Sequence, residues 1–124
     1  WVLEKVKVAI ADALASKPGS TMADIKVACL GLAFKPDIDD LRESPAVKVT
    51  QQIAHLGCQM LAVEPNIEVL PAKLIQANLT LAALDDALET ADVICVLVKH
   101  RPFIEAVKKI REHNFSVDAV GIFA

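Results

Sequence analysis

A polar segment, residues 31–43, carries the side chains most capable of chemistry in this 124-residue chain. It contains two cations, Lys35 and Arg42, and leads directly into Ser44 and Pro45. Serine is a favoured helix N-cap and proline a favoured first helical residue, so a helix is predicted to begin here. The free N–H groups and dipole at a helix start attract anions, and lysine forms charge-assisted hydrogen bonds with phosphate oxygens. The segment therefore predicts a site for a phosphate-bearing ligand.

A second interpretation of this segment stays open. The two cations would then only neutralise acids in a solvated loop, and Phe34 would be an ordinary aromatic residue at the rim of the core. The pair Asp39-Asp40 also suggests a metal or phosphoacceptor site, but a receiver domain needs an acceptor Asp after a central strand, where Val98-Lys99 stands. No metal site is therefore predicted. The acids that the two cations would neutralise in the second interpretation are Asp37, Asp39, Asp40 and Glu43.

Five short apolar runs alternate with helical patterns along the chain and are typical of strands. Strands that are apolar throughout, with helices between them, indicate a parallel sheet covered on both faces. The predicted fold class is α/β, a Rossmann-like three-layer sandwich with a mostly parallel sheet. Ligands of such sheets bind beyond the carboxyl ends of the strands, where connecting loops usually have ~2–6 residues. The loop of residues 31–43 is longer than this, which favours a functional role. The predicted strands are 25–30, 59–63, 79–81, 93–98 and 116–119.

Helical patterns are predicted at residues 1–16, from Ser44 to a closing Gly57, at 85–90 and at 102–112. No capping residue precedes the first pattern, so we expect the chain to be a domain excised from a larger enzyme. Residues 17–21 contain Pro and Gly and are typical of a linker. The predicted organisation is helix 1–16 followed by one domain, residues 22–124.

The glycine fingerprint of dinucleotide-binding sheets is missing, because the four glycines are too far apart for a Gly-x-Gly-x-x-Gly turn. The domain is therefore not expected to bind NAD in the usual way. Glu64 ends the second strand, where NAD domains carry a ribose-binding acid. Without the glycine loop, a capping or loop-ordering role is predicted for it. His55, His100 and His113 have no partner pattern and are predicted to be solvated.

Composition excludes several classes of protein. The net charge is −3, and no basic stripe suggests nucleic acid. No apolar run approaches the ~18 residues of a membrane span, and no signal peptide is visible. The three cysteines stand in apolar stretches, as Cys29, Cys58 and Cys95. They are predicted to be reduced core thiols of a cytoplasmic protein, unsuited to nucleophilic catalysis.

The segment from Gly31 to Ala46, GLAFKPDIDDLRESPA, resembles the signature of the C-terminal domain of the UDP-glucose/GDP-mannose dehydrogenase family. That signature is Gly-x-x-Phe-Lys, four residues, Asp-x-Arg and a Ser-Pro helix start. Together with the segments Val63–Ile67 and Val117–Ala119, this segment is most similar to the sequences of members that act on UDP-N-acetyl-D-mannosamine. The resemblance covers essentially the whole chain, and it implies that residues 1–16 are the end of the long central helix that links the two halves of such enzymes.

The resemblance implies an NAD-dependent oxidation of a UDP-sugar to the uronate, in which two NAD are reduced and a thioester forms on a catalytic Cys outside this chain. It implies that Phe34 and Lys35 hold the UDP-sugar and that Arg42 reaches NAD bound by another domain. Where the family has a second substrate-binding cation, this chain has Val120. The first helix would build a homodimer interface, and the product would serve polysaccharide synthesis. The chain alone is expected to be inactive.

Val120 keeps an alternative open, a non-catalytic interaction module that retains the Rossmann-like sheet but has lost its ligand. A glycine-rich dinucleotide motif and a catalytic Cys upstream in the full-length protein would distinguish the enzyme from the module.

Overall fold

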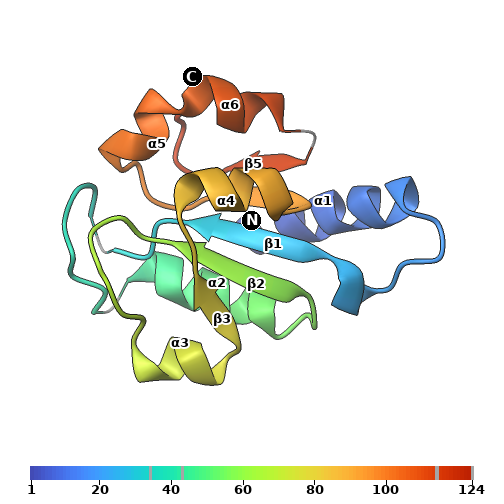
Figure 1. Ribbon diagram of the computed structural model, residues 1–124, viewed down its shortest axis with the longest axis horizontal. Coiled ribbons are helices and arrows are strands. Elements are labelled where there is room, and N and C mark those ends of the chain that lie inside the picture. Colours follow the sequence, from blue (N-terminus) through green and yellow to red (C-terminus); the bar gives the residue numbers. More distant parts are fainter. Residues whose placement is uncertain (34, 43, 114, 124) are drawn as a thin grey trace.

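The computed structural model describes residues 1–33, 35–42, 44–113 and 115–123. Within these residues one sheet contains β1 (Lys26–Leu30), β2 (Gln59–Val63), β3 (Leu79–Leu81), β4 (Val93–Val96) and β5 (Ser116–Asp118). The helices are α1 (Val2–Ser16), α2 (Pro45–Ala54), α3 (Ala72–Gln76), α4 (Leu84–Thr90), α5 (Arg101–Glu105) and α6 (Val107–Glu112). A 3-10 turn, η1 (Met22–Asp24), precedes β1. Figure 1 shows the sheet crossing the molecule between helices.

The sheet is parallel throughout, in the order β3-β2-β1-β4-β5. Its central strand is β1, in which Cys29 stands opposite Ala62 of β2 on one side and Cys95 of β4 on the other. The chain first winds from β1 towards β3 and then returns to build β4 and β5 beyond the other edge of β1. The switch point of the topology therefore lies at the carboxyl ends of β1 and β4, where ligands of such sheets bind.

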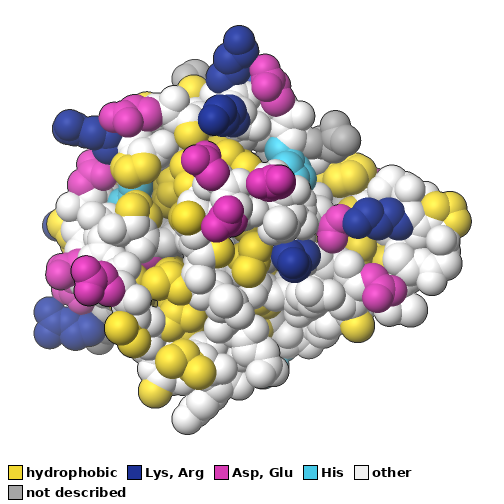
Figure 2. Space-filling view, in the orientation of Figure 1, with side chains coloured by type: hydrophobic (Ala, Val, Ile, Leu, Met, Phe, Trp, Pro, Cys, Tyr) yellow, Lys and Arg dark blue, Asp and Glu magenta, His cyan; other side chains and the backbone are white. Residues whose placement is uncertain are grey.

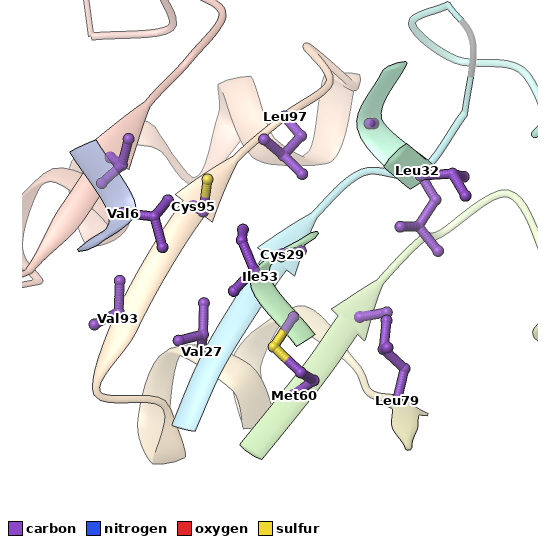
Figure 3. Packing of buried hydrophobic residues seen from close by; sticks show 14 of the residues in the cluster. Val6, Val27, Cys29, Leu32, Ile53, Met60, Leu79, Val93, Cys95 and Leu97 are labelled. Atoms are coloured by element: carbon purple, nitrogen blue, oxygen red, sulfur yellow. The ribbon is translucent and has the colours of Figure 1, made fainter. Parts of the chain in front are cut away.

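Two hydrophobic cores lie on opposite faces of the sheet, because successive strand residues point to opposite sides. Val27 and Cys29 of β1 pack with α1 and α2, as Figure 3 shows for part of this cluster. Ala28 and Leu30 pack with α4, α5 and α6. The predicted α/β fold with three layers is confirmed.

The helix α4 illustrates how one helix serves both the core and the surface. Ala87 faces the sheet and is fully buried, whereas Asp85, Asp86 and Glu89 are exposed. Figure 2 shows acidic side chains gathered over this helix. Among the described residues, no helix combines the length and the hydropathy that crossing a bilayer requires.

The predicted strands are all present, and three are shorter than expected. β1 begins at Lys26 instead of Ile25, and β5 ends at Asp118 instead of Ala119. The predicted strand 93–98 ends at Val96, because the N–H groups of Leu97 and Val98 both donate to the carbonyl of Leu30 and the regular ladder stops there. The predicted helix 102–112 is divided at Ala106, which leaves helical geometry at φ −97° and ψ 11°. Two single-turn elements, α3 and η1, were not predicted from the sequence.

Candidate functional site

The first residue after β1, Gly31, brings two strand ends into direct contact. Its φ is +98°, in the region that favours glycine. A Cβ at this position would lie 2.5 Å from Cβ and 3.0 Å from the backbone N of Val98, which follows β4. The N–H of Gly31 also donates to the carbonyl of Val63 at 2.8 Å. The ends of β1, β2 and β4 are therefore packed together at the edge where the long loop begins.

Glu64, directly after β2, is the polar centre of this edge and is only 2% exposed. Its Oε1 accepts the N–H of Leu32 at 2.9 Å and that of Ala33 at 3.0 Å. Its Oε2 accepts the backbone N–H of Asn66 at 3.0 Å and the side-chain amide of Asn66 at 3.1 Å. The predicted loop-ordering role is confirmed. The carboxylate is committed to protein donors and does not stand free for a ribose.

His100 completes this cluster and corrects a prediction. It was expected to be solvated but is fully buried. Burial is tolerated because its ring nitrogens have partners, and Nε2 lies 2.8 Å from Glu64 Oε1. Its Nδ1 accepts the N–H of Asp37 at 2.7 Å, so in this arrangement Nε2 carries the proton and donates to Glu64. His113, also expected to be solvated, is half-buried and its Nε2 lies 2.8 Å from the carbonyl oxygen of Ala91. His55 is exposed, as predicted.

The pKa of Glu64 reflects these contacts. Burial alone would raise it, but hydrogen bonds from His100 and from the N–H groups of Leu32 and Asn66 hold it below the ordinary value of 4.5. A carboxylate that accepts several hydrogen bonds is favoured in its charged form. Glu64 is therefore an anion that is neutralised inside the protein rather than by a ligand.

The loop ends at the start of α2, where the predicted cap is present. Ser44 is buried, donates its hydroxyl to the carbonyl of Ala33 at 3.3 Å and accepts the N–H of Val47 at 3.5 Å. Pro45 occupies the first turn, where its missing N–H costs nothing. The two ends of the loop are thus joined through Ser44 and Ala33, beside the N–H groups at the helix start.

A cavity of about 190 Å³ lies at this switch point. It is formed by the loops after β1, β4 and β5 and by the first residues of α2. Most of the wall is apolar, and Lys99 is the one cation among the described residues that line it. Sequence reasoning did not assign Lys99, although its place directly after the most hydrophobic strand could have indicated it. The lining residues are Ala33, Pro36, Pro45, Ala46, Leu97, Val98, Lys99 and Val120.

The predicted cations stand outside that lining. Lys35 is exposed and lies between Ala33 and Pro36, two residues of the cavity wall. The side chain of Arg42 is 89% exposed and folds back onto Asp40, with Nε–Oδ1 and Nη2–Oδ2 distances of 3.1 Å. This hydrogen bond and the neighbouring guanidinium charge lower the pKa of Asp40. Phe34 lies outside the described residues.

Val120 contributes an apolar wall where the sequence departs from the signature. It follows β5 in a turn held by Asp118, whose carboxylate accepts N–H groups from Val120, Gly121, Ile122 and Phe123 at 2.8–3.2 Å. The cavity therefore meets a valine side chain on the β5 side and Lys99 on the β4 side.

Metal and thiol chemistry find no support in the described residues. No group of three or more His, Cys, Asp or Glu side chains among them could hold a metal ion. Burial raises the pKa of Cys29 to about 12 and that of Cys95 well above 9.0. The pKa of Cys58 is also raised by burial. These thiols are protonated at neutral pH, and nucleophilic attack requires the thiolate.

Comparison with known proteins identifies a consistent set of relatives. Residues 28–124 match the sequence model of the UDP-glucose/GDP-mannose dehydrogenase family, UDP binding domain. The UDP-N-acetyl-D-mannosamine dehydrogenase of Escherichia coli K12 is 48% identical over 99% of this chain and 29% of its own length. That of Campylobacter jejuni is 50% identical over 85% of this chain and 24% of its own length. The chain spans less than a third of the length of these relatives.

Among solved structures, the fold is similar to that of a ternary complex of GDP-mannose dehydrogenase from Pseudomonas aeruginosa. The TM-score is 0.67 at 26% identity, and the match covers 97% of this chain and 28% of that one. The similarity spans α1 as well as the sheet, because nearly the whole chain is aligned.

Proposed function

The chain belongs to the UDP-glucose/GDP-mannose dehydrogenase family as its UDP-binding domain, and from this premise we propose that it binds the UDP part of a UDP-sugar at the carboxyl edge of its sheet. The observation that carries the proposal is the cavity between the ends of β1, β4 and β5 and the start of α2. A diphosphate placed there would meet the N–H groups of the helix start and the ammonium of Lys99. Lys35, next to the cavity wall, is proposed as a further ligand, together with Phe34.

The first loop does not fit a dinucleotide. In dinucleotide-binding sheets the N–H groups after the first strand face the pyrophosphate. Here those of Leu32 and Ala33 donate to Glu64, and Val98 fills the space above Gly31. We therefore propose that NAD is held by a part of the full-length enzyme outside this chain. Arg42, exposed on the loop, is the residue proposed to reach it, so Arg42→Ala should raise the KM for NAD of the full-length enzyme without changing UDP affinity.

For the full-length protein we propose NAD-dependent oxidation of UDP-N-acetyl-D-mannosamine to the uronate, with the product used in polysaccharide synthesis. The support is the identity to dehydrogenases of this name in Escherichia coli and Campylobacter jejuni. The domain would contribute substrate binding, with no catalytic residue assigned to it. Turnover of this sugar nucleotide by the full-length enzyme, with other UDP-sugars as competitors, tests the assignment.

We also propose that the protein is cytoplasmic and that the full-length enzyme is a homodimer. The free thiols Cys29, Cys58 and Cys95 suit the reducing cytoplasm. Trp1, just before α1, and Val8 of α1 are 73% and 62% exposed beside a groove of about 740 Å³ that also touches β5, which suits a homodimer contact. Sedimentation of the full-length protein would contradict the proposed homodimer if only monomers were found.

Calorimetry with UDP and with UDP-N-acetyl-D-mannosamine tests the proposed site. Lys35→Ala should weaken binding by about 1.5–3 kcal/mol, because a hydrogen bond to a charged group is lost. This corresponds to an affinity reduced by roughly tenfold to a hundredfold. Lys73→Ala, an exposed lysine on α3, is the matched control and should leave the affinity unchanged. Equal affinity of the Lys35 variant and the original chain would remove Lys35 from the site.

One observation favours a second candidate, a binding module without nucleotide. Val120 presents a methyl surface to the cavity where the resembling signature has a cation. If the folded chain showed no calorimetric response to millimolar UDP, while its thermal unfolding stayed cooperative, the module would be the better description.

A further inference from the structure

The buried pair of Glu64 and His100 does more than fill the interior of the sheet edge. Together the two side chains contact backbone N–H groups of three residues in the first loop: Leu32, Ala33 and Asp37. Glu64 comes from the end of β2 and His100 from the segment after β4. The pair therefore connects the loop after β1 to the ends of both neighbouring strands.

Glu64 receives five donors, and this number restricts what can replace it. Oε1 accepts from Leu32, Ala33 and His100, while Oε2 accepts twice from Asn66. A carboxylate is acceptor-only at both oxygens, whereas an amide has one oxygen and one NH₂ group. Glutamine of the same shape would therefore turn a donor towards other donors in either orientation. An ionised carboxylate is the side chain that satisfies all five.

His100 transmits this anchoring to the middle of the loop. Its Nε2 faces Glu64 at 2.8 Å, and its Nδ1 accepts from Asp37 at 2.7 Å. Asp37 has a φ of +61°, uncommon for a residue with a side chain, and its Oδ1 accepts the N–H of Arg101 at 2.8 Å. Two hydrogen bonds thus hold Asp37 in this backbone conformation, two residues after Lys35.

We propose that Glu64 and His100 are positioning residues that hold the loop of residues 31–42 in the conformation in which Lys35 meets the diphosphate. The inference rests on the proposed function for the identity of the ligand. Its structural part, that the loop conformation depends on the pair, stands on the contacts alone. Neither residue touches the ligand in this scheme.

Two histidine variants separate the two contacts. His100→Asn places an amide near the Nδ1 position, where its oxygen accepts from Asp37 but its NH₂ does not reach Glu64. His100→Gln places the amide near the Nε2 position, where it donates to Glu64 but does not reach Asp37. Glu64→Gln replaces one of the two acceptor oxygens at the centre with an NH₂ donor. His55→Gln and Glu89→Gln, both at exposed positions, are the matched controls.

Amide hydrogen exchange followed by NMR and calorimetry with UDP test the proposal on the whole chain. Exchange at Asp37 should accelerate at least tenfold in His100→Gln and stay slow in His100→Asn. Exchange at Leu32 and Ala33 should accelerate in Glu64→Gln, while β5 keeps its protection. UDP affinity should fall about tenfold in His100→Gln and recover at least partly in His100→Asn. The control variants should match the original chain.

The outcomes distinguish this inference from the proposed function. Lys35→Ala should lower UDP affinity without changing exchange at Asp37. A variant that lost its fold would instead show faster exchange at Asp37 as well as weaker binding. If the original chain did not bind UDP, the proposed function and the ligand part of this inference would both fall, while the exchange data would still decide whether the pair holds the loop. Unchanged exchange at Asp37 in His100→Gln, or unchanged UDP affinity despite faster exchange, would overturn the inference. Should Glu64→Gln fail to fold, the two histidine variants carry the test.

Discussion

At the scale of single residues, Gly31 shows how closely two strand ends approach. Any side chain there would meet both the side chain and the backbone of Val98, in addition to the strain of φ +98°. Backbone atoms cannot move aside as the end of a flexible side chain can. The close approach, rather than the positive φ alone, makes this position intolerant of a Cβ.

Gly31→Ala should therefore destabilise the chain by clearly more than Gly57→Ala. Gly57 also has a positive φ, +95°, but a Cβ there would find its nearest neighbour at 3.8 Å. Backbone strain of this kind costs about 1–2 kcal/mol per residue. Urea denaturation should show a loss of roughly that size for Gly57→Ala and at least ~2 kcal/mol more for Gly31→Ala, in line with overpacking costs. Similar losses for the two variants would show that steric contact with Val98 is unimportant.

Residue patterns in the sequence were sufficient for Ser44, Pro45 and Glu64 but not for His100. Ser-Pro before an apolar stripe is a local signal, and the role of Glu64 followed from its place after a strand without a glycine loop. The contacts of His100 join residues 36 and 63 positions away in the sequence. Local spacing carries no information about such partners, so the histidine was wrongly predicted to be solvated.

At the scale of elements, α2 links the loop to the sheet. Its N-terminus lines the cavity and its buried residues Val47, Thr50 and Ile53 face the core. The cap at Ser44 therefore has two roles: it satisfies a free N–H of the first turn and fixes Ala33 relative to the helix start.

Ser44→Ala should lower the free energy of unfolding by about 1 kcal/mol, the usual cost of losing an N-cap. The hydroxyl also donates to Ala33, so the loss should exceed that of Ser20→Ala, a half-buried serine in the linker after α1 whose hydroxyl donates only to the carbonyl of Lys17 among the described contacts. Chemical denaturation of both variants provides the measurement. A Ser44 variant as stable as the original chain would mean that the 3.5 Å contact to Val47 contributes nothing.

The strand β4 was predictable because all four of its residues are apolar, and its short length separates it from a helix. The short helix α3 was not, because five residues are too few for an apolar stripe to repeat. The break between α5 and α6 was missed for the opposite reason. Phe103 and Ile110 are both buried and share a helical spacing, so the pattern continues across the interruption at Ala106.

At the scale of the whole molecule, buried or half-buried carboxylates that accept hydrogen bonds make stability depend on pH. Glu64, Asp92 and Asp118 all have pKa values below their ordinary values, where hydrogen bonds outweigh the effect of burial. A group whose pKa is lower in the folded state binds more protons when unfolded. Its contribution is therefore complete above the ordinary pKa and is lost as pH falls through the folded-state pKa.

We expect the free energy of unfolding to decrease as pH falls below the ordinary values of 4.5 for Glu and 3.8 for Asp. Denaturation curves recorded at a series of pH values provide the measurement. Glu64→Gln should reduce the slope between pH 4.5 and 3 without abolishing it, because the two aspartates remain. An acid slope unaltered by that substitution would contradict the lowered pKa of Glu64.

The winding order of the sheet has a consequence for synthesis on the ribosome. β1, β2 and β3 are neighbours in space and emerge first, so three of the five strands can assemble while the remainder of the chain is still being translated. β4 follows at Val93, and until it arrives one edge of β1 has no partner and Gly31 faces no Val98. His100 emerges later still than β4. The contacts that join the carboxyl ends of β1 and β4 can therefore form only after β1, β2 and β3 have emerged.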